Sequence, residues 1–255
     1  IAEEEPPSAE ETPLDVELGE KLFLEDRFSQ SFFLNARGKV NEVISKGEPV
    51  LEFLQIPFGV MEHPQRGKQI SCSSCHMVDQ ASSIISDKVF SYNDFASRTR
   101  IPFRDDGGHA TTRNSMNMVM SSLKDGLPLH WDGEFFSGAD LSCASLAGRN
   151  MGWLNAENAQ AKRHIVSVVR ADSGDYPTDS DLTESYSLSF EKLGFNLKTM
   201  TDERVFRTLC ETIAAYMKDI DFSRDDKGQL NGSAYDQFLE LNDIARAPKP
   251  SQSPA

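Results

Sequence analysis

The stretch "QISCSSCHMVD", residues 69–79, gathers residue types that are scarce in this chain. The chain has 4 cysteines and 5 histidines among 255 residues, and here two serines separate Cys72 from Cys75, with His76 directly after. C-x-x-C-H is the attachment signal of a c-type haem. The two thiols reach the vinyl groups on one edge of the porphyrin, and the histidine comes up beneath the iron as the proximal ligand. The stretch therefore predicts a covalent haem c.

Two other uses of a C-x-x-C pair need a context that the sequence does not offer. A zinc site requires two further ligands at knuckle-like spacing, and the remaining cysteines, Cys143 and Cys210, stand alone. A redox-active dithiol requires a strand-to-helix turn within a βαβ pattern, and no such pattern is visible. Haem attachment is the interpretation that these comparisons favour.

Haem attachment also indicates a compartment. Thioether formation takes place outside the cytoplasm, so we expect a periplasmic or otherwise exported protein, in keeping with Ile1 as first residue in place of a methionine. In an oxidising space Cys143 and Cys210 either pair as a disulfide or remain two separate buried thiols. The sequence leaves both alternatives open.

The composition excludes some partners. Hydrophobic residues make up 38% and charged residues 26% of the chain, which is typical of a soluble globular protein. No run of eighteen apolar residues occurs, so we expect no membrane span. The net charge of −14 repels phosphate backbones and excludes nucleic acid, whereas it favours a basic protein partner.

The order of elements indicates an all-α fold with long loops. We expect a flexible acidic tether at 1–13, one folded domain at 14–245 and a flexible tail at 246–255. Apolar spacing predicts helices over 12–26, 201–220 and 233–241, the first with Thr12 as N-cap and the second capped by Thr201. Residues 77–130 are rich in Ser, Asn, Asp and Gly and predict loops, so a large cofactor would help to organise the core.

Several short motifs occur in a fixed order around the haem signal. They are "LGEKLFLEDRFS" (18–29), "TRNSMNMV" (112–119), "HWDG" (130–133), "GRNMGW" (148–153) and "SAYDQFLELN" (233–242). This series, with the C-x-x-C-H signal, resembles the bacterial di-haem cytochrome c peroxidase family, which includes the MauG-type enzymes. The resemblance runs from Leu18 to Asn242 and matches the N-terminal, peroxidatic haem domain of the family.

The resemblance implies an all-helical, cytochrome c-like domain that reacts with hydrogen peroxide and receives electrons through a second haem domain or chain. It implies that Trp131 lies between the two haems, and that Asn114 helps to bind a calcium ion. It also implies a structural motif near the interdomain linker, formed by Tyr235, Asp236 and Phe238.

The sixth iron ligand is left open. His109 is placed like the distal histidine of the peroxidases, although the spacing to the following "RN" is shorter. The alternatives are His130, an open position, or a thioether ligand from Met116, Met118, Met120 or Met151. His63 and His164 are interpreted as ordinary surface residues.

The chain departs from the family pattern at four places. It contains one C-x-x-C-H, so a second haem would lie on a missing segment or a partner chain, unless the protein carries a single haem. Asn150 stands where the family has a catalytic Glu, and Glu157 is a candidate substitute. Glu134 replaces an expected Arg. Residues 31–68 form a family-atypical insertion, too rich in large apolar groups to be disordered.

Three functions from different classes remain compatible with these observations. The first is an enzyme that reduces peroxide or oxidises a partner at a covalent haem, with His109 and Trp131 near the reacting centre. The second is a non-enzymatic mono-haem electron carrier or redox subunit, which the single haem signal and Asn150 favour. The third is an interaction module that docks through residues 31–68.

Overall fold

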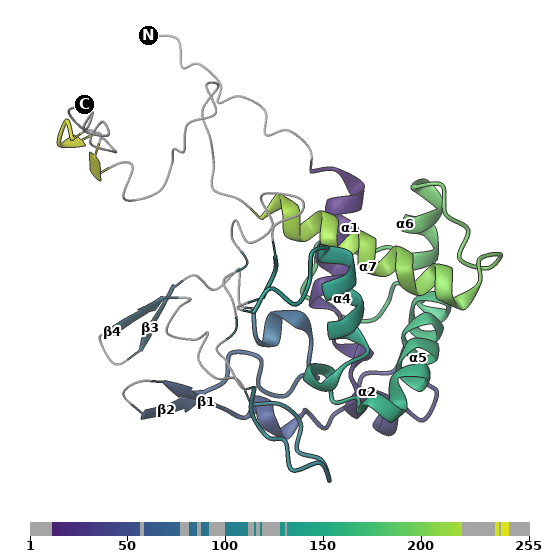
Figure 1. Ribbon diagram of the computed structural model, residues 1–255, viewed down its shortest axis with the longest axis horizontal. Helices are drawn as coiled ribbons and strands as arrows, with labels where there is room; N and C mark the ends of the chain where they lie inside the picture. The colour runs from purple at the N-terminus through teal and green to yellow at the C-terminus, as the bar shows by residue number, and fades with distance from the viewer. Residues whose placement is uncertain are drawn as a thin grey trace. The chain divides into compact units, whose positions relative to one another are not determined.

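Helices form most of the regular structure in the computed structural model of the chain (Figure 1). The structure describes residues 12–56, 59–76, 82–85, 88–91, 100–111, 115, 118, 128–130, 132–220, 238–239 and 241–244. Residues 1–219 and 220–255 are two units, and every element named below belongs to the first. Its α-helices are α1 (Leu14–Leu24), α2 (Gln30–Ala36), α4 (Gly138–Leu146), α5 (Asn158–Ala171), α6 (Tyr186–Lys192) and α7 (Asp202–Asp219). Its short 3-10 helices are η1 (Asp26–Phe28), η2 (Pro49–Leu51), η3 (Cys72–Ser74), η4 (Arg149–Met151) and η5 (Asn155–Glu157).

Two short hairpins accompany the helices. Strand β1 (Phe53–Ile56) pairs with β2 (Gly59–Glu62), and β3 (Ser82–Ile85) pairs with β4 (Lys88–Ser91), both antiparallel. A two-stranded hairpin is marginally stable by itself, so the core of the described chain is helical, in agreement with the all-α prediction. No helix in the described ranges combines the length and the apolar character that a membrane crossing requires.

Helices α1 and α7 pack closely against one another. The apolar stripe predicted for α7 is buried, and its members with the least exposure are Val205, Phe206, Leu209 and Ile213. Gly19 permits the close approach, because a Cβ at this position would lie 2.4 Å from the Thr212 carbonyl oxygen. Any side chain at Gly19 would push the two helices apart.

The starts of these two helices differ from one another. The Arg204 N–H donates to Thr201 Oγ1 over 3.3 Å, so the predicted cap of α7 is confirmed. Helix α1 begins at Leu14, with Pro13 in the N-cap position and no side-chain cap. The prediction that Thr12 caps α1 was wrong, because the proline holds an extended conformation (ψ 139°) and thereby starts the helix one residue later.

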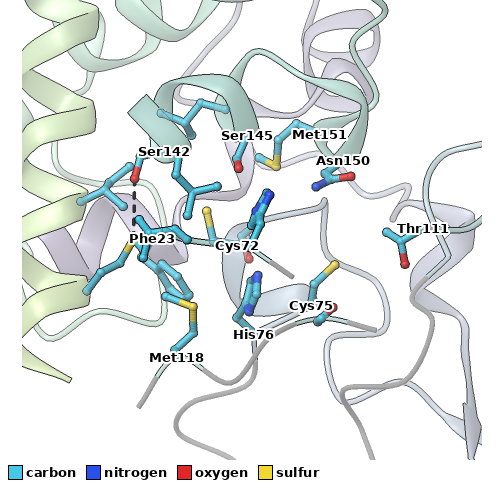
Figure 2. A pocket seen from close by; sticks show the side chains of 18 of the residues that line it. Phe23, Cys72, Cys75, His76, Thr111, Met118, Ser142, Ser145, Asn150 and Met151 are labelled. Atoms are coloured by element: carbon cyan, nitrogen blue, oxygen red, sulfur yellow. Dashed lines mark hydrogen bonds between the residues drawn. The ribbon is translucent and has the colours of Figure 1, made fainter. Parts of the chain in front are cut away.

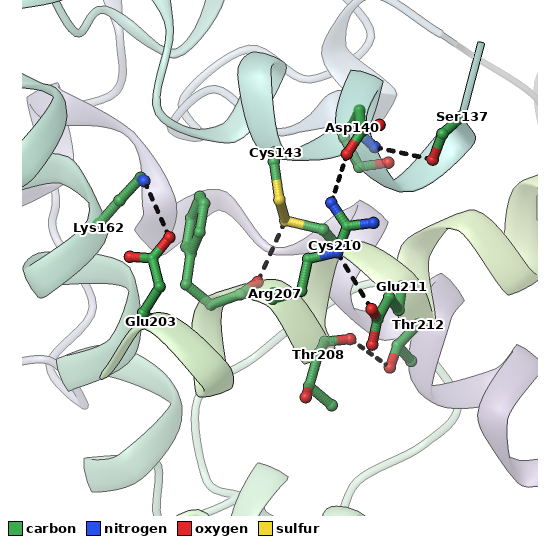
Figure 3. Close-up of a disulfide and its surroundings, with 12 residues drawn as sticks. Ser137, Asp140, Cys143, Lys162, Glu203, Arg207, Thr208, Cys210, Glu211 and Thr212 are labelled. Atoms are coloured by element: carbon green, nitrogen blue, oxygen red, sulfur yellow. Dashed lines mark hydrogen bonds and ion pairs between the residues drawn. A yellow bond between two sulfur atoms is a disulfide. The ribbon is translucent and has the colours of Figure 1, made fainter. Parts of the chain in front are cut away.

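Helix α4 is fixed to α7 by a disulfide. Cys143 of α4 and Cys210 of α7 are bonded, with their Cα atoms 5.3 Å apart (Figure 3). The α4 helix starts at Ser137, whose Oγ accepts the Asp140 N–H over 3.3 Å. Of the two alternatives that the sequence left open, the disulfide is therefore the one observed.

The described residues of the segment 31–68 contribute side chains to the helical core, so the prediction that its apolar content keeps it from being disordered is confirmed for this part. Phe32 on α2 is fully buried, and Leu51 is 2% exposed. Ser29 starts α2 by accepting the Phe32 N–H at 3.2 Å. Phe53 on β1 remains 51% exposed, so the hairpin contributes little to the core.

Candidate haem-attachment site

The C-x-x-C-H residues form a tight turn. Helix η3 begins at Cys72, whose carbonyl oxygen accepts the N–H groups of Cys75 at 3.1 Å and of His76 at 3.0 Å. Ser71 precedes the turn, and its N–H donates to Ser74 Oγ over 3.0 Å. The turn brings both thiols and the imidazole to the wall of one cavity (Figure 2).

That cavity has a volume of about 440 Å³, within the usual range for a ligand site. Three helices form one side of it, and loops form the other. The apolar side chains of its wall include Phe23 from α1, Leu141 and Leu146 from α4, and Ile213 and Met217 from α7. Buried apolar walls of this kind suit a flat, largely apolar macrocycle.

The two thiols of the turn are reduced, and neither takes part in a disulfide. Burial, with the nearby Cys75 thiol, raises the pKa of Cys72 to about 12, so this thiol is protonated at neutral pH. Cys143 and Cys210 are bonded to one another and hence supply no thiolate ligand to a zinc ion at the turn. The chemistry of the turn thus fits thioether formation better than metal binding by four cysteines.

The predicted ligand His109 does not line the cavity. It is exposed, and its Nδ1 lies 3.1 Å from the Gly107 carbonyl oxygen, although the next residues, Ala110 and Thr111, do line the wall. His130 lines the cavity, and so do the buried Met118 and Met151. Asn114, Met116, Met120, Trp131, Tyr235 and Asp236 lie outside the described residues, whereas Phe238 is described and half exposed.

The two residues considered for proton transfer occupy different places. Asn150 lines the cavity, as Figure 2 shows, whereas Glu157 does not. Glu157 accepts the Leu154 N–H at 2.9 Å and pairs with Arg104 at 2.8 Å. Burial by itself would raise the pKa of Glu157, but these two contacts hold it below its usual range. Glu157 therefore serves local structure and does not face the cavity.

The sequence reasoning named His130 as a possible ligand and Glu134 as a departure from the family pattern, but it missed that both belong to one group of titratable residues on the loop that follows Pro128. His130, Asp132 and Glu134 all line the cavity, and their ligand atoms lie within 4.8 Å of one another. The loop is closed by the Leu129 N–H, which donates to the Phe135 carbonyl oxygen over 2.6 Å. The available signal was the concentration of three titratable residues within five positions of "LHWDGEF"; the segment folds as a turn, with His130 at φ 68° and Gly133 at φ 70°.

The interpretation of His63 and His164 as surface residues was wrong. His63 is 3% exposed and His164 is 7% exposed. The Gln65 N–H donates to His63 Nδ1 over 3.0 Å, and His164 Nε2 lies 2.7 Å from the Arg27 carbonyl oxygen. Burial lowers the pKa of both imidazoles, and a neutral imidazole with a backbone partner is readily accommodated in a core.

Comparisons of the chain with protein family models, with curated proteins and with solved structures found no match.

Proposed function

We propose that the chain is a c-type haem redox protein, which reduces peroxide or oxidises a partner at a haem held by Cys72, Cys75 and His76. One observation carries this proposal: the three residues converge on the wall of a single cavity of about 440 Å³. The helical unit around the cavity supports a cytochrome c-like fold in the manner of the peroxidase family. Bound haem would supply one-electron redox chemistry and a coordination position for peroxide.

The residues present fit such a group. The thiols of Cys72 and Cys75 are available for covalent bonds, and His76 offers an imidazole beside them. The Phe23 ring lies 6.4 Å from the His76 ring, centroid to centroid, and restricts its orientation. The apolar side chains on the helical side of the cavity, among them Phe23, Leu146 and Ile213, would contact the ring of such a group.

Peroxide chemistry needs a group that passes protons near the reacting oxygen. The amide of Asn150 cannot do this at neutral pH, but Asp132 and Glu134 on the same cavity wall carry carboxylates. These two side chains are our candidates for proton transfer. The roles of His109 and Trp131 at the reacting centre, and of Asn114 in calcium binding, stay predictions.

A second candidate function is electron transfer without catalysis. Met118 and Met151, which are 4% and 3% exposed, both line the cavity. A thioether on the sixth position would close the iron to peroxide and raise the reduction potential. In either case the net charge of −14 favours a basic redox partner or a second haem chain, and the disulfide favours an exported protein.

The first experiment tests attachment. The chain is produced in a host that matures c-type cytochromes, and covalent haem is measured per polypeptide by the pyridine haemochrome assay. We expect one haem per chain and no covalent haem in Cys72→Ser/Cys75→Ser, whereas the less stable Cys143→Ala/Cys210→Ala should still carry one haem on each folded chain. A wild-type chain that matures without covalent haem would overturn the proposal.

The second experiment separates the two functions through visible spectra with cyanide and with peroxide. Spectral change, together with oxidation of a reduced partner or dye by peroxide, supports the enzyme. A spectrum indifferent to both reagents that becomes responsive in Met118→Leu or Met151→Leu supports the electron carrier and identifies its ligand.

A further inference from the structure

Gln65 lies at the end of the segment 31–68 and contacts the two serines between the haem-binding cysteines. Its Nε2 donates to Ser73 Oγ over 2.7 Å, and its Oε1 accepts from Ser74 Oγ over 2.6 Å. Gln65 is 8% exposed, Ser73 is 5% exposed and Ser74 is fully buried. One buried amide thus satisfies both hydroxyls inside the C-x-x-C turn.

The contact belongs to a wider network that fixes the turn from its N-terminal side. Ser73 Oγ lies 2.8 Å from Ser71 Oγ, and the Gln69 N–H donates to Asp26 Oδ2 over 3.1 Å. The Gln69 side chain in turn donates to the Lys46 carbonyl oxygen over 2.6 Å. The network therefore joins the turn to η1 and to the segment 31–68.

The backbone that carries Gln65 is itself held closely. The Glu48 N–H donates to the Lys68 carbonyl oxygen over 2.9 Å. A Cβ on Gly47 would lie 2.6 Å from the backbone of Gly67, so the two chain segments touch where Gly47 has no side chain. These contacts consequently fix the backbone position from which the Gln65 side chain reaches the turn.

We propose that Gln65 is a positioning residue, which presets the C-x-x-C-H turn so that both cysteine thiols and His76 face the cavity before haem is attached. This inference rests on the proposed function. It assigns a role to the family-atypical segment 31–68, which is to shape the cavity that receives the haem. Attachment adds each thiol S–H across a vinyl double bond, forming one C–S and one C–H bond without an oxidant, so correct placement of the sulfur atoms is what the chain must provide.

An amide suits this position because its NH2 group donates to Ser73 and its oxygen accepts from Ser74, without any charge. Alanine removes both. Glutamate loses the donor when ionised and places a charge in a buried site, whereas a protonated glutamate again offers one donor and one acceptor. The pair Gln65→Ala and Gln65→Glu therefore separates loss of packing from loss of hydrogen bonding.

The test uses the full chain after haem attachment, and the control is Gln160→Ala, which changes an exposed glutamine. We measure single and double thioether products by mass spectrometry, and the iron reduction potential across pH. Gln65→Ala should accumulate single-thioether chains and shift the potential at every pH. The reduction potential of Gln65→Glu should differ from that of the wild type at high pH, where the glutamate is ionised. It should approach the wild-type value at low pH, where the glutamate is protonated. Attachment and potentials equal to those of the wild type in both variants would overturn the proposal.

A further readout separates failure of this inference from failure of the haem proposal. In the full chain produced without haem, hydrogen exchange of the Cys75 and His76 backbone amides, which donate to the Cys72 carbonyl oxygen, reports opening of the turn. These amides should exchange about tenfold faster in Gln65→Ala than in wild type, since a buried hydrogen bond is worth roughly that factor in a local opening equilibrium. Unchanged exchange would contradict the role of Gln65, whatever the haem content of the wild type.

Discussion

The two sides of the cavity are built differently. One side consists of α1, α4 and α7, fixed by the Cys143–Cys210 disulfide and by the close contact at Gly19. The other side consists of loops held by polar contacts, such as the Arg149–Asp106 pair at 2.8 Å. Cys72, Cys75, His76 and His130 all lie on the loop side. The helical side therefore sets the shape of the cavity, whereas the loop side carries its chemistry.

The largest stability effect is expected at the disulfide. It joins residues 67 apart in sequence, and a loop of that length corresponds to about 4 kcal/mol in the chain-entropy model. We expect Cys143→Ala/Cys210→Ala to lose about that much free energy of unfolding, measured by urea denaturation. Wild-type chain with a reductant is the matched comparison. A loss below about 1 kcal/mol would mean that packing alone holds the helical side.

The next effect is expected at Gly19. An alanine Cβ there would lie 2.4 Å from the Thr212 carbonyl oxygen, so α1 must shift away from α7, at a cost of about 2 to 3 kcal/mol. Gly38→Ala is the control, because no atom lies within 4 Å of its Cβ position and its positive φ of 85° alone costs about 1 kcal/mol. The free energy of unfolding of both variants is measured by urea denaturation. Equal losses of this free energy in Gly19→Ala and Gly38→Ala would argue against a tight α1–α7 contact.

Asp26 provides a test on the loop side, because it accepts the Gln69 N–H just before the C-x-x-C-H turn. Burial, and then the charge of Glu25, raises the pKa of Asp26 from 3.8 to about 6. Between these pH values the folded chain holds a proton that the unfolded chain has released, so this group makes stability fall as the pH rises through that window.

The two Asp26 oxygens accept separate bonds, Oδ2 from the Gln69 N–H and Oδ1 from the Tyr176 hydroxyl, so Asp26→Asn removes the charge and one of the two acceptors. The lost acceptor changes stability equally at every pH, whereas loss of the charge does not, so the stability of the variant relative to wild type should rise by about 2 kcal/mol between pH 4 and pH 6. Urea denaturation across that pH range measures it. A difference that does not change with pH would show that the Asp26 carboxyl is not desolvated.

The success of the sequence predictions also differs between the helical side and the loop side of the cavity. The long amphipathic pattern of 201–220 and its Thr201 cap are local signals, and they placed α7 correctly. Pairing of Cys143 with Cys210 depends on a 5.3 Å Cα separation between two helices, which no local pattern encodes. The sequence therefore predicted α1 and α7 of the helical side, but neither α4 nor the covalent link between α4 and α7.

On the loop side the sequence predicted that the C-x-x-C-H residues act together, and the structure brings all three to one cavity. It missed the cavity-facing Glu134, which the family pattern presented only as a missing Arg. It also missed the burial of His164, because the partner of its imidazole, the Arg27 carbonyl oxygen, lies 137 residues away. Irregular segments take their positions from such distant contacts, so their side chains cannot be placed from local spacing.

The smallest effect is expected at Arg207, which joins the same two helices as the disulfide. It pairs with Asp140 of α4, and the two side chains are 39% and 56% exposed. It also pairs with Glu211 on α7 at 3.1 Å (Figure 3). Water and salt screen exposed pairs, so Arg207→Ala should lose no more than about 0.5 kcal/mol, and less at high ionic strength.

Urea denaturation at low and high salt measures this loss, and the Cys143→Ala/Cys210→Ala variant provides the background for a second measurement. In that background Arg207→Ala should cost about the same small amount, because the disulfide and the ion pair act on the α4–α7 contact independently. A cost of several kcal/mol there would mean that the ion pair and the disulfide stabilise one another, and that the helical side of the cavity is not fixed by the covalent link alone.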